Sequence, residues 1–312
     1  MSPLSVIQSQ KQIPASREFL SYLARFLFFC ILASFISLSS LSGKKSFPAR
    51  GFAKLLTGNE AAIRLESYRS FIGRDLNNTN FHQAYAFRFR LRHMPRRGDE
   101  FSRTGTLYGL ALGHGLSRID FDSTETEAYS RNFLLQNGLT PRAWVYSSHS
   151  RKTRLLEEGE LFKPFISGMN QSPFDLLMPF VFWNAKYVKS GKVAGRPSHL
   201  YSFTSPQWVE SVRPDLTSIV MALDDNYEAP LRIETFAQSN VAERTFILNS
   251  LKKVSDHWIV KSLDYKNRQT RSNTRFEVTA AALELDLDPT FLTAAGLKSQ
   301  PVVPNEAFVS TK

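Results

Sequence analysis

The sequence is poor in the residues that metal sites and covalent catalysis need. Its 312 residues include one cysteine, Cys30, so no disulfide can form within the chain and no zinc site can be built from cysteines. The six histidines show no HxH or HExxH spacing, and no GxSxG motif marks a hydrolase nucleophile. The glycines of GLALGHGLS (109–117) match neither a dinucleotide-binding loop nor a P-loop. We therefore expect no catalytic residue, no metal site and no cofactor, and predict that the protein is not an enzyme.

No internal repeat of constant period occurs, which excludes solenoids and propellers. With 15 glycines and 15 prolines the chain is also not collagen-like or proline-rich. Hydrophobic residues make up 42% and include 25 phenylalanines, which is enough for a folded core. The net charge of +11 permits nucleic-acid binding. Arginine clusters in a chain that also carries an export signal argue against nucleic-acid binding, so we expect no nucleic-acid partner.

The longest uncharged apolar run is Phe26–Leu41, which Arg25 precedes and Lys44 follows. As a helix it would rise about 24 Å, short of a hydrocarbon core of about 30 Å. Basic residues before the run and small residues after it are typical of a signal peptide. We predict that 1–43 is a signal peptide or, left uncleaved, an N-terminal membrane anchor. A buried helix of a soluble domain is the remaining interpretation.

A helix is predicted over 52–73, because apolar residues recur there at three- and four-residue spacing and Gly73 can end it. The residues expected on its buried face are Ala61, Leu65, Tyr68 and Ile72.

The clearest strand covers 85–92, where the texture changes to period two. One face carries Tyr85, Phe87, Phe89 and Leu91. The other face carries Arg88, Arg90 and Arg92. A turn at 94–100 and a returning strand at 101–112 complete a predicted hairpin.

Further candidate strands follow along the chain, and from all the candidates we predict a meander of about ten or eleven strands in antiparallel order. The further candidates are 117–122, 131–136, 144–148, 155–158, 199–204, 218–224, 231–237, 243–253, 258–265 and 274–278. A segment at 161–183 interrupts them and is predicted to contain a short helix or two helical turns. A meander this long must curl or close to cover its apolar face.

Several stretches follow one another in a familiar order. They are PFDLLMPF (173–180), GRPSHLYSF (195–203), LDDNYEAPLRIETFAQ (223–238), LKKVSDHWIVKSLDYKNRQTRSNTRFEV (251–278) and LDPTFLTAAGL (287–297). This order resembles the LolA-like superfamily, the periplasmic outer-membrane lipoprotein-sorting proteins. The resemblance covers 52–297 and is most specific over 195–297.

The resemblance implies an α+β fold: an incomplete, half-open antiparallel β-barrel with helices covering its concave face. Known members bind acyl chains of lipoproteins or lipids in that concave cavity. It therefore implies a LolA-like lipid-binding domain over 44–297, followed by a flexible C-terminal tail over 298–312. The implied partners are an acylated lipoprotein or lipid, an inner-membrane donor and an outer-membrane acceptor. We expect a monomer in the periplasm, anchored to the inner membrane if the N-terminal segment is retained.

No residue here matches a lipid-holding residue of the family one to one, so the binding site is predicted by face. Tyr85, Phe87, Phe89 and Leu91 are the candidate cavity wall; the alternative is an ordinary core strand. The candidate lid over the barrel mouth consists of Phe174, Leu177, Met178, Phe180 and Phe182; the alternative is a helix that fills a hole. Arg88, Arg90 and Arg92 are candidates for contact with lipid head groups; the alternative is a solvated outer face.

Three functions remain open at this stage. The first is an exported carrier that holds acyl chains, of the outer-membrane lipoprotein-sorting type. The second is a membrane-anchored periplasmic sensor or regulatory scaffold with the same fold, which an uncleaved anchor would favour. The third is a lipid hydrolase, against which stand the missing nucleophile motif and metal spacing.

Overall fold

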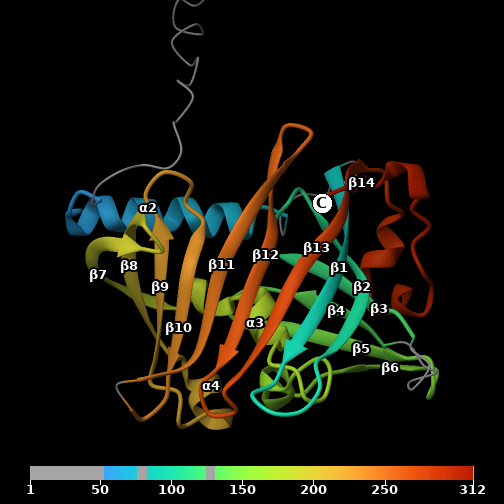
Figure 1. The fold of residues 1–312 in the computed structure, drawn as a ribbon, viewed down its shortest axis with the longest axis horizontal. Helices are drawn as coiled ribbons and strands as arrows, with labels where there is room; N and C mark the ends of the chain where they lie inside the picture. Colours follow the sequence, from blue (N-terminus) through green and yellow to red (C-terminus); the bar gives the residue numbers. More distant parts are fainter. Residues whose placement is uncertain (1–52, 76–82, 124–130, 240, 312) are drawn as a thin grey trace, which may run out of the picture. The chain divides into compact units, whose positions relative to one another are not determined.

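The computed structural model describes residues 53–75, 83–123, 131–239 and 241–311. The predicted signal peptide or anchor at 1–43 lies outside these residues. Within them, fourteen strands form one antiparallel sheet in the order β6-β5-β4-β3-β2-β1-β13-β12-β11-β10-β9-β8-β7, with β14 also paired to β13 (Figure 1). The sheet is open, because its two edge strands β6 and β7 are not paired with each other.

The sheet consists of two meanders of consecutive strands. The first contains β1 (Ala84–Met94), β2 (Phe101–Leu110), β3 (Leu116–Phe121), β4 (Arg131–Gln136), β5 (Arg142–Ser147) and β6 (Lys152–Leu155). The second contains β7 (Asn184–Val193), β8 (Arg196–Thr204), β9 (Ser218–Asp224), β10 (Pro230–Phe236), β11 (Ala242–Val254), β12 (His257–Asn267) and β13 (Ser272–Leu285). Pairing of β1 with β13 joins the two meanders. The short helix α4 (Gln207–Val212) lies between β8 and β9 in the chain.

The prediction of ten or eleven strands was wrong, and the missing strands have a physical explanation. Strand β7 is an edge strand with mostly exposed or half-exposed side chains, so its sequence lacks an apolar face. Strand β14 (Val309–Ser310) has two residues and no pattern of its own. The strand predicted at 155–158 is also displaced: β6 ends at Leu155, and a 3₁₀ helix begins at Glu158.

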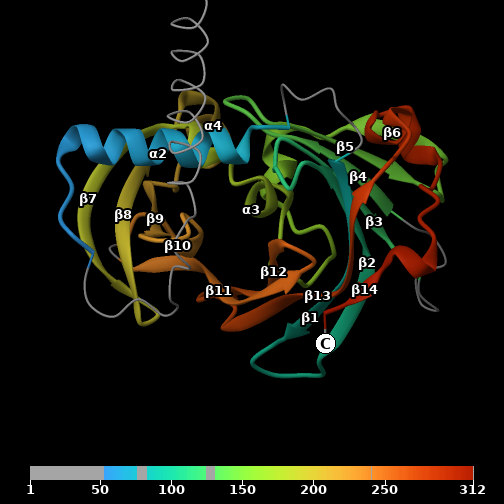
Figure 2. The same cartoon turned by 90° about the horizontal axis from the view of Figure 1, so that it is seen from above.

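The predicted helical insertion is confirmed and connects the two edges of the sheet. It contains η2 (Glu158–Phe162), α3 (Pro173–Leu177) and η3 (Pro179–Phe182). Met178 adopts a left-handed conformation with φ 51° and separates α3 from η3, since Pro179 cannot continue the α-helix. Seen from above, α3 lies inside the curve of the sheet (Figure 2).

Helix α2 (Gly58–Ile72) confirms the first predicted helix, including its four buried residues and its end at Gly73, but it begins at Gly58, later than the predicted start at 52. Thr57 and Glu60 form a capping box at its start. Its buried face packs against side chains of η3 and strands β8 to β10. Arg69 donates hydrogen bonds of 2.7 Å to the carbonyl oxygens of Val181 and Trp183, which fastens α2 to η3. The wider expectation, that helices cover the concave face, stays a prediction.

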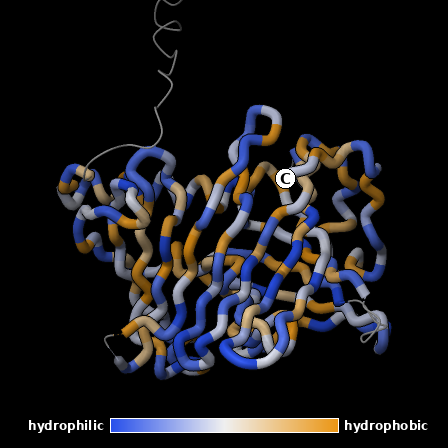
Figure 3. The backbone as a smooth tube through the Cα atoms, in the orientation of Figure 1, coloured by the Kyte–Doolittle hydropathy of each residue, from blue (hydrophilic) through white to orange (hydrophobic). Residues whose placement is uncertain are grey.

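Strand β1 shows the predicted alternation of apolar and basic residues. Tyr85, Phe87, Phe89 and Leu91 are all buried, whereas Arg90 and Arg92 are exposed. We call the side that carries the apolar row the inner face and the side that carries the arginines the outer face. Alternating polar and apolar residues mark most long strands (Figure 3). Each fully buried aromatic or aliphatic side chain on the inner face stabilises the fold by about 1.5–3 kcal/mol.

The segment after β13 packs on the outer face. The sequence predicts that this segment is a flexible tail from residue 298 onward. It contains η4 (Pro289–Leu292), η5 (Gly296–Lys298), η6 (Asn305–Ala307) and β14. Arg118, which is fully buried, uses all five of its N–H donors and fastens η4 and η5 to β3. Two bonds of 2.7 and 2.9 Å reach Asp120, and three reach the carbonyl oxygens of Phe291, Gly296 and Ser299. A desolvated arginine needs this complete set of partners.

Candidate functional site

An apolar cavity of about 400 Å³ lies on the inner face of the sheet. Its walls come from the C-terminal half of α2, from β1 and β2, from α3, and from β11 to β13. Phe87, Leu107, Leu251, Val260 and Phe276 are among the side chains that line it. Small-molecule sites in proteins typically enclose roughly 300–1,000 Å³ and are mostly apolar. The cavity therefore has the size and chemistry to hold an apolar chain.

The predicted wall residues divide into two groups. Tyr85 and Phe87 line the cavity, whereas Phe89 and Leu91 lie in the packed core. Phe89 stacks on Phe276 with ring centres 5.2 Å apart and meets Phe121 edge-on at 5.7 Å. Phe165 of the insertion extends this packed core, with its ring centre 5.9 Å from that of Phe121. The apolar face of β1 is thus partly cavity wall and partly ordinary core.

The predicted lid residues are also divided. Met178 lines the cavity, and Leu177 is buried in the inner core. Phe174 and Phe180 are buried in the second core cluster beneath α2, with Phe182 packed against it. The insertion thus contributes one side chain of the predicted five to the cavity.

Polar contacts hold the insertion to the sheet. Ser172 caps α3 and exchanges hydrogen bonds with Asp175, whose carboxylate lies 2.7 Å from a guanidinium nitrogen of Arg244 on β11. Gln171 donates a 3.1 Å hydrogen bond to the hydroxyl of Tyr265. Movement of α3 would have to break the ion pair between Asp175 and Arg244, so a lid function stays a hypothesis.

The three predicted head-group arginines lie on the outer face, opposite the cavity. Arg88 stacks over Phe308 at 3.9 Å and donates to Asn305. Arg92 lies 3.9 Å from a carboxylate oxygen of Glu100. Arg90 is exposed. The structure does not bring these side chains to the cavity.

A second, more polar chamber of about 450 Å³ adjoins the apolar cavity. The two share Arg74, Tyr85, Leu112 and His257 as lining residues. Arg74 directly follows the end of α2, and His257 begins β12. The sequence patterns single out neither residue as a site, because both lie at the ends of elements where periodicity carries no information. Both become neighbours of the cavity through tertiary packing.

Two large apolar side chains remain exposed beside the cavity. Phe71 is 45% exposed and Trp258 is 58% exposed, and both belong to the cavity lining. They come from α2 and from the start of β12. Exposed aromatic side chains at a cavity edge provide an apolar path between the cavity and its surroundings.

Burial keeps His114 and three tyrosine side chains of the cavity wall neutral. Desolvation, reinforced by the nearby Arg74, lowers the pKa of His114 from 6.5 to about 4. Burial also raises the pKa values of the Tyr68, Tyr85 and Tyr265 hydroxyls. Tyr85 donates a 3.2 Å hydrogen bond to the carbonyl oxygen of Gly113. At neutral pH these side chains present uncharged surface to the cavity.

Buried Asp75 fixes the end of α2 against the turn between β2 and β3. Both of its carboxylate oxygens accept from the Gly115 backbone N–H, at 2.8 and 2.9 Å, and one accepts from that of Leu116 at 2.8 Å. Desolvation raises the pKa of this carboxyl group, against the opposing effect of these hydrogen bonds. The contacts position Arg74, the preceding residue, at the boundary between the two chambers.

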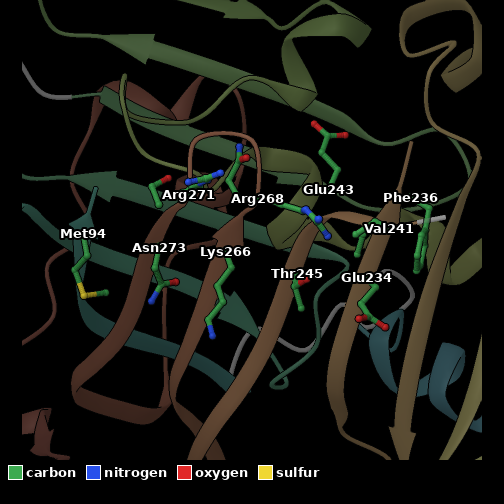
Figure 4. A pocket seen from close by; sticks show the side chains of 13 residues that line it. Met94, Glu234, Phe236, Val241, Glu243, Thr245, Lys266, Arg268, Arg271 and Asn273 are labelled. Carbon is green, nitrogen blue, oxygen red and sulfur yellow. The ribbon is translucent and has the colours of Figure 1, made fainter. Parts of the chain in front are cut away.

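A larger hollow of about 730 Å³ lies on the outer face near the ends of β10 to β13 (Figure 4). Its floor is a row of side chains in register across five strands, namely Met94, Asn273, Lys266, Thr245 and Glu234. Arg268 and Arg271 border it from the turn between β12 and β13. We call it the outer groove. Its lining mixes charged, polar and apolar side chains, and the charges disfavour an acyl chain.

In the part of the chain that the structure describes, no group of histidine, cysteine, aspartate or glutamate side chains could hold a metal ion. The same residues include no helix with the length and hydrophobicity to cross a membrane.

Three solved structures share the fold. A domain from Vibrio parahaemolyticus assigned to the outer membrane lipoprotein-sorting proteins superposes with a TM-score of 0.61 at 15% identity, covering 77% of this chain and 97% of that one. A DUF1329 family protein from Desulfovibrio piger gives 0.58 at 14% identity, with 75% and 99% covered. A LolA superfamily protein from Nitrosomonas europaea gives 0.56 at 11% identity, with 75% and 97% covered. No protein-family model and no curated protein matches the sequence. The chain therefore has the LolA-like open-barrel fold, as the resemblance implies.

Proposed function

We propose that this protein is an exported carrier that holds an acyl chain of a lipid or lipoprotein in the inner cavity. The observation that carries the proposal is the cavity of about 400 Å³, which is lined mainly by aromatic and aliphatic side chains. Burying one methylene group is worth about 0.8 kcal/mol, so ten of them provide roughly 8 kcal/mol before entropic costs. Such a site needs no polar chemistry to bind.

The fold supports the same proposal at a coarser level. One of its structural neighbours is assigned to the outer membrane lipoprotein-sorting proteins. A shared fold specifies a ligand weakly, so the lining of the cavity carries more weight. In this proposal the protein acts in the periplasm as a monomer and receives its cargo from an inner-membrane donor. It passes the cargo to an outer-membrane acceptor, and transfer follows the acceptor's higher affinity without chemical catalysis.

The test is to express the full-length chain in a bacterial host, purify it from the periplasm without detergent, and measure its mass under native conditions. Lipid extraction of the same sample identifies any bound molecule. We expect a bound species that carries at least one acyl chain. An apo protein that also takes up no added fatty acid or lysophospholipid would contradict the proposal.

The outer groove supports a second candidate, a membrane-anchored regulatory scaffold. Lys266, Arg268, Arg271 and Glu234 offer a polar surface suited to another protein rather than to a lipid. This function requires the N-terminal segment to stay uncleaved. N-terminal sequencing of the purified protein, together with membrane fractionation, separates the two: a cleaved protein in the soluble fraction excludes the anchored scaffold.

A further inference from the structure

The inner cavity and the polar chamber together match the two parts of an amphiphile, an apolar chain and a polar group. The apolar cavity of about 400 Å³ and the polar chamber of about 450 Å³ share four lining residues, so a single elongated molecule can occupy both. An acyl chain fits the first chamber by its chemistry. The second chamber would then receive whatever group is attached to that chain, and its charges decide which group fits.

Arg74 is the cation common to both linings. Its guanidinium lies over the ring of Phe71, 4.3 Å from the ring centre. Asp75 attracts it, but both oxygens of that carboxylate already accept backbone hydrogen bonds from Gly115 and Leu116. Arginine stays charged at any physiological pH and presents a planar set of donors that matches carboxylate and phosphate groups.

The acidic groups lining the apolar cavity are each balanced by a nearby cation. The pairs are Asp175 with Arg244 at 2.7 Å, Asp256 with Lys253 at 3.2 Å, and Glu228 with Arg64 at 3.7 Å. In the polar chamber Glu284 is exposed and opposes Arg74 in charge. His114, on the cavity side, is neutral at pH 7. Arg74 is thus the group at the boundary best able to bind an anion.

We propose that Arg74 binds an anionic head group, carboxylate or phosphate, of an amphiphile whose acyl chain occupies the inner cavity. This inference rests on the proposed function, because it assumes that the cavity takes the chain. It adds that the cargo carries its negative charge next to the first carbons of that chain. Neutral amphiphiles of the same chain length bind more weakly.

Calorimetric titration of the full-length protein with four probes tests the inference. Dodecanol supplies a chain without charge, dodecanoate adds a carboxylate, dodecyl phosphate adds a phosphate, and inorganic phosphate supplies an anion without a chain. Charge-assisted hydrogen bonds are stronger than those between neutral groups. We expect at least one of the two anionic amphiphiles to bind about tenfold or more tightly than dodecanol, and inorganic phosphate to show no measurable binding. The tighter of the two identifies the head group as a carboxylate or a phosphate.

Three variants locate the effect. Arg74→Gln should abolish the preference for the anionic amphiphiles, so that they bind no more tightly than dodecanol binds to the same variant. Glu284→Gln should raise the affinity for the anions, because it removes a negative charge that repels the negatively charged head group. Arg90→Gln is the matched control: it removes an arginine from the outer face and should leave all four affinities unchanged.

Each contrary result identifies what fails. Equal affinities for dodecanol and both anions, or a preference that survives in Arg74→Gln, would overturn the role of Arg74 and leave the carrier function standing. If inorganic phosphate binds as tightly as dodecyl phosphate, Arg74 belongs to a simple anion site. This result would overturn the inference that the ligand is an amphiphile. No binding of any dodecyl probe would contradict the proposed function itself, and this inference with it.

Discussion

The inner cavity and the outer groove lie on opposite faces of the same strands, and the smaller of the two is the better candidate site. The outer groove encloses about 730 Å³ but is lined by Lys266, Arg268 and Glu234. The inner cavity encloses about 400 Å³ and is lined mainly by aromatic and aliphatic side chains. The comparison teaches that volume alone does not identify a binding site. The chemistry of the lining decides what can enter, since an apolar chain gains nothing from contact with hydrated charges.

Both hollows arise from one property of β-strands, the alternation of side chains between faces. On β11, Phe246 faces the inner cavity and Thr245 the outer groove. On β12, Tyr265 and Lys266 divide in the same way. Neighbouring residues of one strand thus serve separate surfaces, so single substitutions can alter one hollow and leave the other unchanged.

The largest expected effect tests whether the outer face is only a solvated surface or also stabilises the fold. Replacing fully buried Arg118 by Met leaves the Asp120 carboxylate and three carbonyl oxygens without their donor. Removal of one partner of a buried ion pair costs about 3–5 kcal/mol. Urea unfolding followed by circular dichroism measures this loss. Arg90→Met, on the exposed part of the same face, should change the stability by less than about 0.5 kcal/mol.

A pH series sharpens the description of the inner wall. The pKa of His114 is about 4 in the folded protein against an ordinary 6.5. Because the folded pKa is the lower one, the unfolded chain takes up a proton first as the pH falls. The contribution of His114 to the free energy of unfolding is therefore fully present above pH 6.5. It decreases as the pH falls towards 4, by at most about 3 kcal/mol. His114→Asn should lose this part of the pH dependence, and identical slopes for both proteins would contradict a neutral wall.

A matched pair of charges on β11 compares the two hollows directly. Leu251→Glu places a carboxylate in the wall of the inner cavity and should weaken the binding of a neutral acyl probe at least tenfold, about 1.4 kcal/mol. Thr245→Glu introduces the same group in the outer groove and should leave that affinity unchanged. Titration with dodecanol measures both. Equal losses in the two variants would show that binding does not depend on the inner cavity.

The smallest expected effect concerns the outer groove itself. Lys266→Gln removes a charge from its floor and should change the stability by no more than about 0.5 kcal/mol, with no effect on acyl binding. Chemical unfolding and the same dodecanol titration measure both. A large loss of acyl binding would show that the two faces are coupled, contrary to their separation by the sheet.

Where one element determines its own pattern, the sequence was sufficient. The period-two alternation of β1 gave the correct faces for Phe87 and Arg90, and the spacing in α2 gave the correct buried residues. The resemblance gave the open antiparallel sheet that the three solved structures share. Edge strand β7 escaped notice because it buries little and therefore needs no apolar row.

The site was less accessible to sequence reasoning, because a cavity is defined by what fails to pack. Phe87 and Phe89 share a face and a residue type, yet one lines the cavity and the other is in close contact with Phe121 and Phe276. The difference lies in these contacts with β3 and β13, which tertiary packing brings to Phe89. Arg74 belongs to no periodic pattern at all, and tertiary packing alone gives it its place.

The pairing of β1 with β13 has a consequence for the order in which the molecule can form. Thr279 and Arg88, which meet at this seam, are 191 residues apart in the chain. During synthesis from the N-terminus, β1 is made early and its second partner is among the last strands to appear. Until then one side of β1 has no strand beside it, and contacts this distant form slowly. A nascent chain that stalls before β13 therefore exposes an unpaired strand edge that can aggregate. Shielding by a chaperone would matter most during that interval.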